Sequence, residues 1–152
     1  MTDIKASEEQ DESAPRLLII GDDEAVLRLL SIKLPRAGFR VSAIRRNEAG
    51  ISTSSAEKPD AVVLASQSAT REDTRSLIEQ ISESWGEESP PIVLLSTSHE
   101  LSAIREALRR GCDDYVVMPF SPSELAHRLR VVITRNRLHK IEPHAQSEVP
   151  GP

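Results

Sequence analysis

Short apolar runs of strand length recur along the chain, and helix-length segments separate them. Each run is rich in Val, Ile and Leu, which is typical of strands in a parallel sheet that is covered on both faces. The alternation indicates βα units, so we expect an α/β fold of five strands and five helices in three layers. The expected strands cover residues 16–21, 39–44, 60–65, 92–96 and 115–118.

Local signals indicate where individual helices begin and end. Residues 121–124 read Ser-Pro-Ser-Glu, a capping box with proline at the first helical position. Pro35 predicts that the first helix stops or kinks before it, because proline removes a backbone donor. Residues 50–55 have poor helix propensity, so the second helix is the weakest prediction. The capping box opens an amphipathic helix with one apolar face made of Leu125, Leu129, Val132 and Ile133.

Acidic residues gather where the first strand is expected to end. Asp22, Asp23 and Glu24 follow the apolar run and lead into a segment with helical spacing. The carboxyl edge of an open parallel sheet binds ligands, because loops and helix amino ends surround a crevice there. The same acids also suit a helix start, where exposed amides and the helix dipole favour negative charge. Both interpretations stay open from the residues alone.

Four sequence pieces follow one another at regular intervals. They are Ile-Gly-Asp-Asp-Glu at 20–24, Lys-Pro-Asp-Ala-Val-Val-Leu at 58–64, Pro-Ile-Val-Leu-Leu-Ser-Thr at 91–97 and Gly-Cys-Asp-Asp-Tyr-Val-Val-Met-Pro-Phe at 111–120. In this order they resemble the receiver domain of two-component response regulators, over residues 14–139. The resemblance implies a flavodoxin-like, doubly wound (βα)5 sheet of strand order 2-1-3-4-5. It also suggests a cis Met118–Pro119 peptide bond.

The resemblance carries over part of the family's acidic pocket. It implies that Asp22 and Asp23, with the backbone carbonyl of Gln67, are placed to position a divalent cation. It also makes Ser96 the hydroxyl switch residue and Tyr115 the aromatic one. Magnesium usually relies on substrate phosphate in addition to one or two carboxylates. We therefore expect at most weak magnesium binding and no required cofactor.

Two residues that the family's phosphorylation chemistry needs are missing. The acceptor aspartate position is Ala65, and the lysine position is Met118. The acyl phosphate requires a carboxylate, and the lysine stabilises the charge of the transferred phosphoryl group. Asp60 lies about 16 Å from Ala65 at strand spacing, and Ser66 would need an activating base. We predict a pseudo-receiver without the usual phosphorylation, kept either as a working signalling domain or only as a scaffold.

Composition and the chain ends set the expected organisation. With 38% hydrophobic and 28% charged residues, the chain is typical of one globular domain. We expect that domain over residues 15–140, a disordered acidic tail over 1–14 and a disordered tail over 141–152. The amino terminus has no signal-peptide pattern and no apolar run could cross a bilayer, so we expect a cytoplasmic protein without membrane contact. The single cysteine, Cys112, is expected to pack in the core.

Basic residues are concentrated in the last third of the domain. Residues 99–140 hold eight Lys or Arg against five Asp or Glu, whereas residues 1–98 hold eleven against seventeen. These basic side chains either only keep the exposed face of the last helix hydrated and complement its dipole, or they form a docking face for an acidic partner, such as the chain's own amino terminus. Self-association is a further option, whereas the pI of 5.4 and the scarcity of aromatics argue against nucleic acid. The expected partner-binding residues, beside Tyr115, are Arg105, Arg109, Arg128 and Arg130.

Two classes of function follow from these features. The chain lacks the common nucleotide-binding, hydrolase and metalloprotease motifs, so we do not expect an enzyme. The first class is a single-domain, response-regulator-like protein of two-component or phosphorelay signalling that works as a phosphorylation-independent adaptor through protein contact. The second is a receiver-like switch that a noncovalent ligand or divalent cation controls from the acidic pocket.

Overall fold

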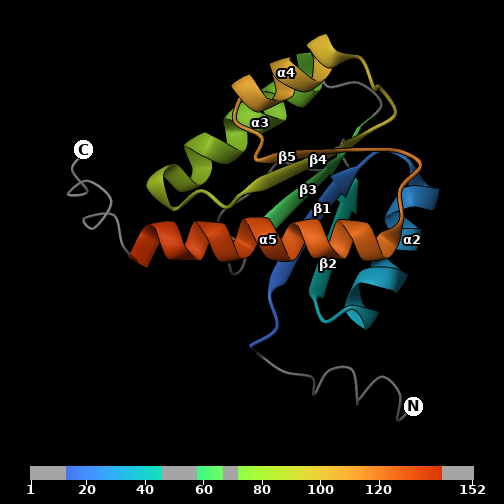
Figure 1. The fold of residues 1–152 in the computed structure, drawn as a ribbon, viewed down its shortest axis with the longest axis vertical. Coiled ribbons are helices and arrows are strands. Elements are labelled where there is room, and N and C mark those ends of the chain that lie inside the picture. Colours follow the sequence, from blue (N-terminus) through green and yellow to red (C-terminus); the bar gives the residue numbers. More distant parts are fainter. Residues whose placement is uncertain (1–12, 46–57, 67–71, 142–152) are drawn as a thin grey trace, which may run out of the picture.

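A five-stranded parallel sheet forms the middle layer of the molecule (Figure 1). The computed structural model describes residues 13–45, 58–66 and 72–141. The strands lie in the order β2-β1-β3-β4-β5, and every neighbouring pair is parallel, which confirms the predicted order. Their bounds are β1 (Arg16–Gly21), β2 (Arg40–Arg45), β3 (Ala61–Ala65), β4 (Ile92–Ser96) and β5 (Asp114–Val117).

Helices cover both faces of this sheet, as expected for three layers. One face packs against α2 and α5, and the other packs against α3 and α4 (Figure 1). The expected second helix, both chain ends and Gln67 lie outside the described residues. The helices are α2 (Glu24–Arg36), α3 (Glu72–Trp85), α4 (Leu101–Arg109) and α5 (Pro122–Ile141), and the short 3-10 helix η2 (Gly86–Glu88) precedes β4.

Alternation along the strands divides the core into two clusters. In β1, Leu17 and Ile19 belong to the cluster of α2 and α5, whereas Ile20 belongs to the cluster of α3 and α4. Successive strand side chains point to opposite faces, so one strand contributes to both clusters. Every residue of β3 and β4 is buried, as expected for inner strands of a sheet covered on both sides.

The predicted helix signals have different outcomes. The Ser121 hydroxyl oxygen accepts from the Glu124 amide at 3.3 Å, and α5 begins at Pro122, which confirms its predicted start. The first helix does not stop before Pro35, because α2 continues to Arg36, and the alternative of a kink there stays a prediction. Proline removes one amide donor, and in the last turn no later turn depends on that bond. The Met118–Pro119 peptide is cis, as predicted.

None of the helices in the described part of the chain is both long enough and apolar enough to cross a membrane.

Candidate functional site

The carboxyl edge of the sheet begins where β1 ends, and two exposed carboxylates follow it. Asp22 and Asp23 come directly after Gly21. The Asp23 Oδ1 atom accepts from the amide of Ala25 at 2.9 Å and from the amide of Val26 at 3.4 Å. Asp23 is therefore the N-cap of α2, since its side chain satisfies amides that the first helical turn leaves unpaired. One of its carboxylate oxygens is thereby committed to the helix.

Ala65 closes β3 at the same edge. It is the register partner of Gly21, and only 4% of its surface is exposed. A Cβ atom placed on Gly21 would lie 3.1 Å from the Ala65 Cβ atom and 3.2 Å from the Leu27 Cδ2 atom. The ends of β1 and β3 are thus so closely packed that a side chain at residue 21 would force its neighbours to move.

Met118 also lies on an apolar part of this edge. It is half-buried and packs against the core cluster that contains Ala65, as do Val26 and Phe120. The two positions to which the resemblance assigns a carboxylate and an ammonium group therefore both belong to hydrophobic packing. A lone charge placed in such surroundings would lose hydration without gaining a partner.

Ser96 lies at the end of β4, next to β3. Its side chain is fully buried, and its Oγ atom accepts from the amide of Ser98 at 3.2 Å. On the neighbouring strand, the amide of Ser66 donates to the carbonyl oxygen of Leu95 at 2.8 Å. The Ser96 hydroxyl is therefore part of the hydrogen bonding that shapes the loop after β4.

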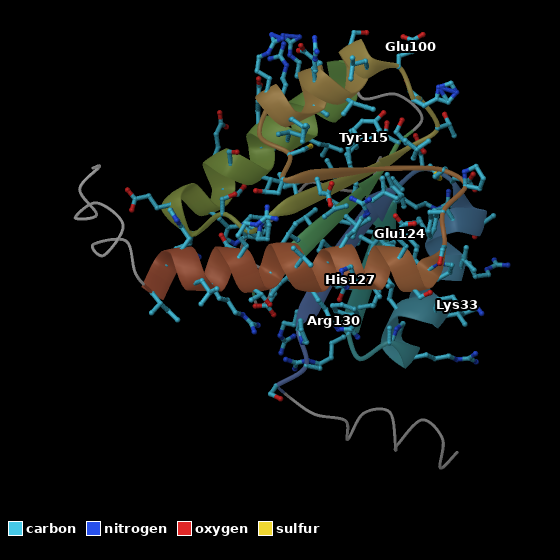
Figure 2. The ribbon with its side chains drawn as sticks, in the orientation of Figure 1. Lys33, Glu100, Tyr115, Glu124, His127 and Arg130 are labelled. Carbon is cyan, nitrogen blue, oxygen red and sulfur yellow. The ribbon has the colours of Figure 1, made fainter. Side chains whose placement is uncertain are left out.

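Tyr115 holds the same loop from β5 (Figure 2). The residue is 8% exposed, and its ring packs in the cluster of α3 and α4. The Tyr115 hydroxyl donates to the carbonyl oxygen of Ser98 at 2.7 Å. Ser96 and Tyr115 thus bind the two backbone groups of one residue. Sequence reasoning missed Ser98, because no residue pattern identifies a backbone carbonyl as the acceptor.

The sheet order, the acids after β1 and the Met-Pro-Phe segment after β5 agree with one family. The sequence profile of the response regulator receiver domain matches residues 17–130, which is more than half of the chain. The chain belongs to the response regulator receiver domain family.

Solved receiver domains share the fold of this receiver. The Francisella response regulator 1452 receiver domain is 25% identical, with a TM-score of 0.67 over 80% of this chain and 98% of that chain. The receiver domain of sensor histidine kinase PA1611 from Pseudomonas aeruginosa, with a magnesium ion coordinated in its active site cleft, is 22% identical and shows the fold alone. Its TM-score is 0.66 over 80% of this chain and 99% of that chain.

A longer protein is also similar in sequence. Transcriptional regulatory protein SrrA of Staphylococcus aureus is 34% identical over 62 residues, which are 39% of this chain and 26% of that protein. The match with this receiver therefore spans about a quarter of the length of that relative.

The carboxyl edge of this receiver offers few ligands for magnesium. Among the residues that the structure describes, no three His, Cys, Asp or Glu side chains are placed to share a metal ion. The Ala65 side chain contributes no oxygen, and the Asp23 Oδ1 atom already accepts from two amides. Magnesium requires near-octahedral oxygen coordination. The described residues therefore fit a magnesium ion poorly, and weak binding stays a prediction.

Arg128 connects α5 to the edge strand β5. It forms ion pairs with Asp114 at 3.1 Å and with Glu124 at 3.2 Å. Hydrogen bonding and charge attraction, mainly from Asp114, raise the pKa of Arg128 above its ordinary value. A cavity of about 490 Å³ lies at this junction and is also lined by His127 and Arg135. The pairing with Asp114 depends on how α5 crosses the sheet, so sequence reasoning did not find it.

The other candidate arginines lie in two further places. Arg130 donates to the carbonyl oxygen of Ala37, and its guanidinium lies 5.2 Å from the centre of the Phe39 ring, on the α2 side of α5 (Figure 2). Arg105 and Arg109 are exposed on α4. The positions of Arg105, Arg109 and Arg128 are thus compatible with one partner-binding face beside β5. The Arg130 side chain instead points toward Ala37 and Phe39.

Proposed function

We propose that this receiver works without phosphorylation, as a pseudo-receiver adaptor that acts through protein contact in two-component or phosphorelay signalling. Ala65 carries the proposal. It ends β3 at the position that the family resemblance gives to the acceptor aspartate, and it is buried. A methyl group cannot form the acyl phosphate on which the usual switch depends. The adaptor has no catalytic step of its own.

Met118 supports the same conclusion from the other side of the edge. It stands where the resemblance places the lysine, and it packs against the cluster that includes Ala65. The edge therefore lacks both the group that accepts the phosphoryl and the cation that stabilises its charge. A receiver that lacked only one of the two groups could still carry out part of the phosphoryl transfer. This receiver lacks both groups that the transfer requires.

The hydrogen bonds around Ser98 favour a receiver with one resting conformation. Ser96 and Tyr115 both bind that residue's backbone. A conformational switch needs a ligand whose binding free energy differs between the two conformations of the protein. Ala65 cannot carry the phosphoryl group that would be this ligand. A partner would then bind the resting state constitutively, at the face near Arg105, Arg109 and Arg128, with an affinity that falls as salt rises.

A receiver switched by a noncovalent ligand is the second candidate, because Asp22 and Asp23 are both exposed at the carboxyl edge. Amide NMR spectra of the purified chain, recorded during titration with magnesium and then with beryllofluoride, separate the two. The adaptor proposal expects the Ser98 and Tyr115 signals to stay in place throughout. Saturable shifts that extend from Asp23 to Tyr115 would instead support the ligand-controlled switch.

A further inference from the structure

Two aspartates occupy matching places at the amino edge of the sheet, which is the edge where its strands begin. Asp60 stands one residue before β3, and Asp113 stands one residue before β5. Each lies one position ahead of the first register pair that its strand forms with the neighbouring strand. Both aspartates belong to sequence pieces that support the family resemblance, and neither lies at the carboxyl edge.

The two aspartates make the same pair of hydrogen bonds to the strand beside them. The Asp60 Oδ2 atom accepts from the amide of Arg16 at 2.8 Å, and the Asp60 amide donates to the carbonyl oxygen of Arg16 at 2.8 Å. The Asp113 Oδ2 atom accepts from the amide of Ile92 at 2.8 Å, and the Asp113 amide donates to the carbonyl oxygen of Ile92 at 2.7 Å. Each aspartate thus closes a hydrogen-bonded ring with the first residue of β1 or of β4.

These rings favour one alignment of the strands. A slip of one residue would move the aspartate away from both groups that it binds, and it would turn the side chains of that strand to the opposite faces. A hydrogen bond from an amide to a charged carboxylate is also stronger than one between neutral groups. The register of β3 on β1 depends in this way on Asp60, and the register of β5 on β4 depends on Asp113.

Asp60 also contacts α5. Its second oxygen, Oδ1, accepts from the Arg137 guanidinium at 3.4 Å, so one carboxylate connects the starts of β1 and β3 with α5. The Asp60 side chain is 34% exposed, so water screens this ion pair only in part. Further along α5, the Lys140 Nζ atom lies 3.4 Å from the Glu88 Oε1 atom, which is also 3.1 Å from the Lys58 Nζ atom. Ion pairs thus attach the carboxyl half of α5 to the amino edge.

We propose that Asp60 and Asp113 are two clamps that set the strand register at the amino edge of the sheet, and that Asp60 also anchors α5 there. The anchor lies at the opposite edge of the sheet from Ala65. It therefore holds α5, which carries Arg128 of the proposed partner-binding face, whether or not the carboxyl edge binds a ligand. This conformational device does not depend on the proposed function.

Native-state hydrogen exchange of the full chain, measured by NMR, tests the clamps one at a time. Asp60→Ala should lower the protection of the Arg16 amide about tenfold relative to that of the Ile92 amide, because the Arg16 amide loses its carboxylate acceptor. Asp113→Ala should do the reverse. Comparing two amides within one variant removes the effect of general destabilisation. The clamps are overturned if either variant lowers the protection of both amides equally.

Asp60→Asn and Arg137→Gln test the anchor of α5. Asparagine still has an oxygen for the Arg16 amide, so that amide should stay protected while the amides of residues 137–141 lose about threefold in protection. Arg137→Gln should give the same threefold loss. The double variant should lose no more than either single variant, because both changes break the same ion pair. Arg135→Gln removes the same charge from α5 and is the matched control, which should leave these amides unchanged.

The anchor is overturned if the losses of Asp60→Asn and Arg137→Gln add in the double variant, or if Arg135→Gln gives the same loss. Circular dichroism melts check that each variant folds. Where an alanine variant does not fold, the asparagine variant at the same position decides, and loss of protection at its bonded amide overturns that clamp. Neither a phosphate donor nor a partner is present, so these outcomes are independent of the tests of the proposed function.

Discussion

Gly21 and Ala65 are register partners where β1 and β3 end, and a Cβ atom on Gly21 would lie 3.1 Å from that of Ala65. Their close packing continues the hydrophobic core to the carboxyl edge, where open α/β sheets bind their ligands. Met118 extends this apolar packing from the other side. The packing of these two strand ends therefore contributes to the stability of the fold. It also leaves an apolar side chain at the position where the family resemblance places the acceptor aspartate.

Gly21→Ala is expected to destabilise the receiver by about 1–3 kcal/mol, because the added methyl group overpacks a filled site. The midpoint of urea denaturation measures this loss. Ser42→Ala on the edge strand β2 is the control, since Ser42 is exposed and the change should stay within about 0.5 kcal/mol. An unchanged midpoint for Gly21→Ala would show that the strand ends separate easily.

Restoring both missing groups should restore phosphate chemistry. Ala65→Asp alone places a carboxyl group near Asp22 and Asp23, which raises a carboxyl pKa through like-charge repulsion, so this variant should bind beryllofluoride weakly. Met118→Lys alone has no phosphoryl group to stabilise. The double variant supplies both groups, and NMR should then show beryllofluoride binding. A folded double variant that binds none would indicate that the geometry of the edge has changed as well.

Asp23 is expected to matter for helix stability. Asp23→Ala removes the acceptor for the amides of Ala25 and Val26 and should cost about 0.5–2 kcal/mol in the free energy of unfolding. Asp23→Asn keeps a side-chain oxygen and should lose much less. Denaturation curves with and without magnesium measure both effects. If the two variants lost the same free energy of unfolding, and only when magnesium is present, Asp23 would be a metal ligand rather than a helix cap.

Cys112 is expected to be unreactive in the folded receiver. Burial, with a smaller effect from Asp113, raises the pKa of its thiol from 9.0 to about 12. At pH 8 this lowers the thiolate fraction about 1000-fold, so Ellman's reagent should label the chain quickly only after unfolding in urea. The folded thiol keeps its proton where the unfolded thiol loses it, so stability should also fall as pH rises above about 9. Rapid labelling of the folded chain would contradict this.

The strand pattern was readable from sequence because each strand is a short apolar run, and the family resemblance supplied their order. The N-cap role of Asp23 was one of two open interpretations; the hydrogen bonds of the helix start confirm the cap, and the ligand interpretation stays a prediction. The helix was expected to stop or kink before Pro35, and it does not stop there, because propensity rules describe helix interiors and this proline lies in the last turn.

Long-range contacts were not predictable in the same way. The hydrogen bond from Tyr115 to Ser98 requires the placement of a loop, and the contact of Arg130 with Phe39 requires the crossing of α5 over the sheet. Composition indicated a basic last helix but not the direction of each arginine. That direction separates Arg128 from Arg130, which the sequence had grouped together.

Intact-mass spectrometry of the purified chain after incubation with acetyl phosphate and magnesium shows whether this receiver accepts a phosphoryl group. The Ala65→Asp, Met118→Lys double variant is the positive control under the same conditions. We expect that the unchanged chain gains no phosphoryl mass, because Ala65 provides no carboxylate. A stoichiometric gain of one phosphoryl group on the unchanged chain would contradict it.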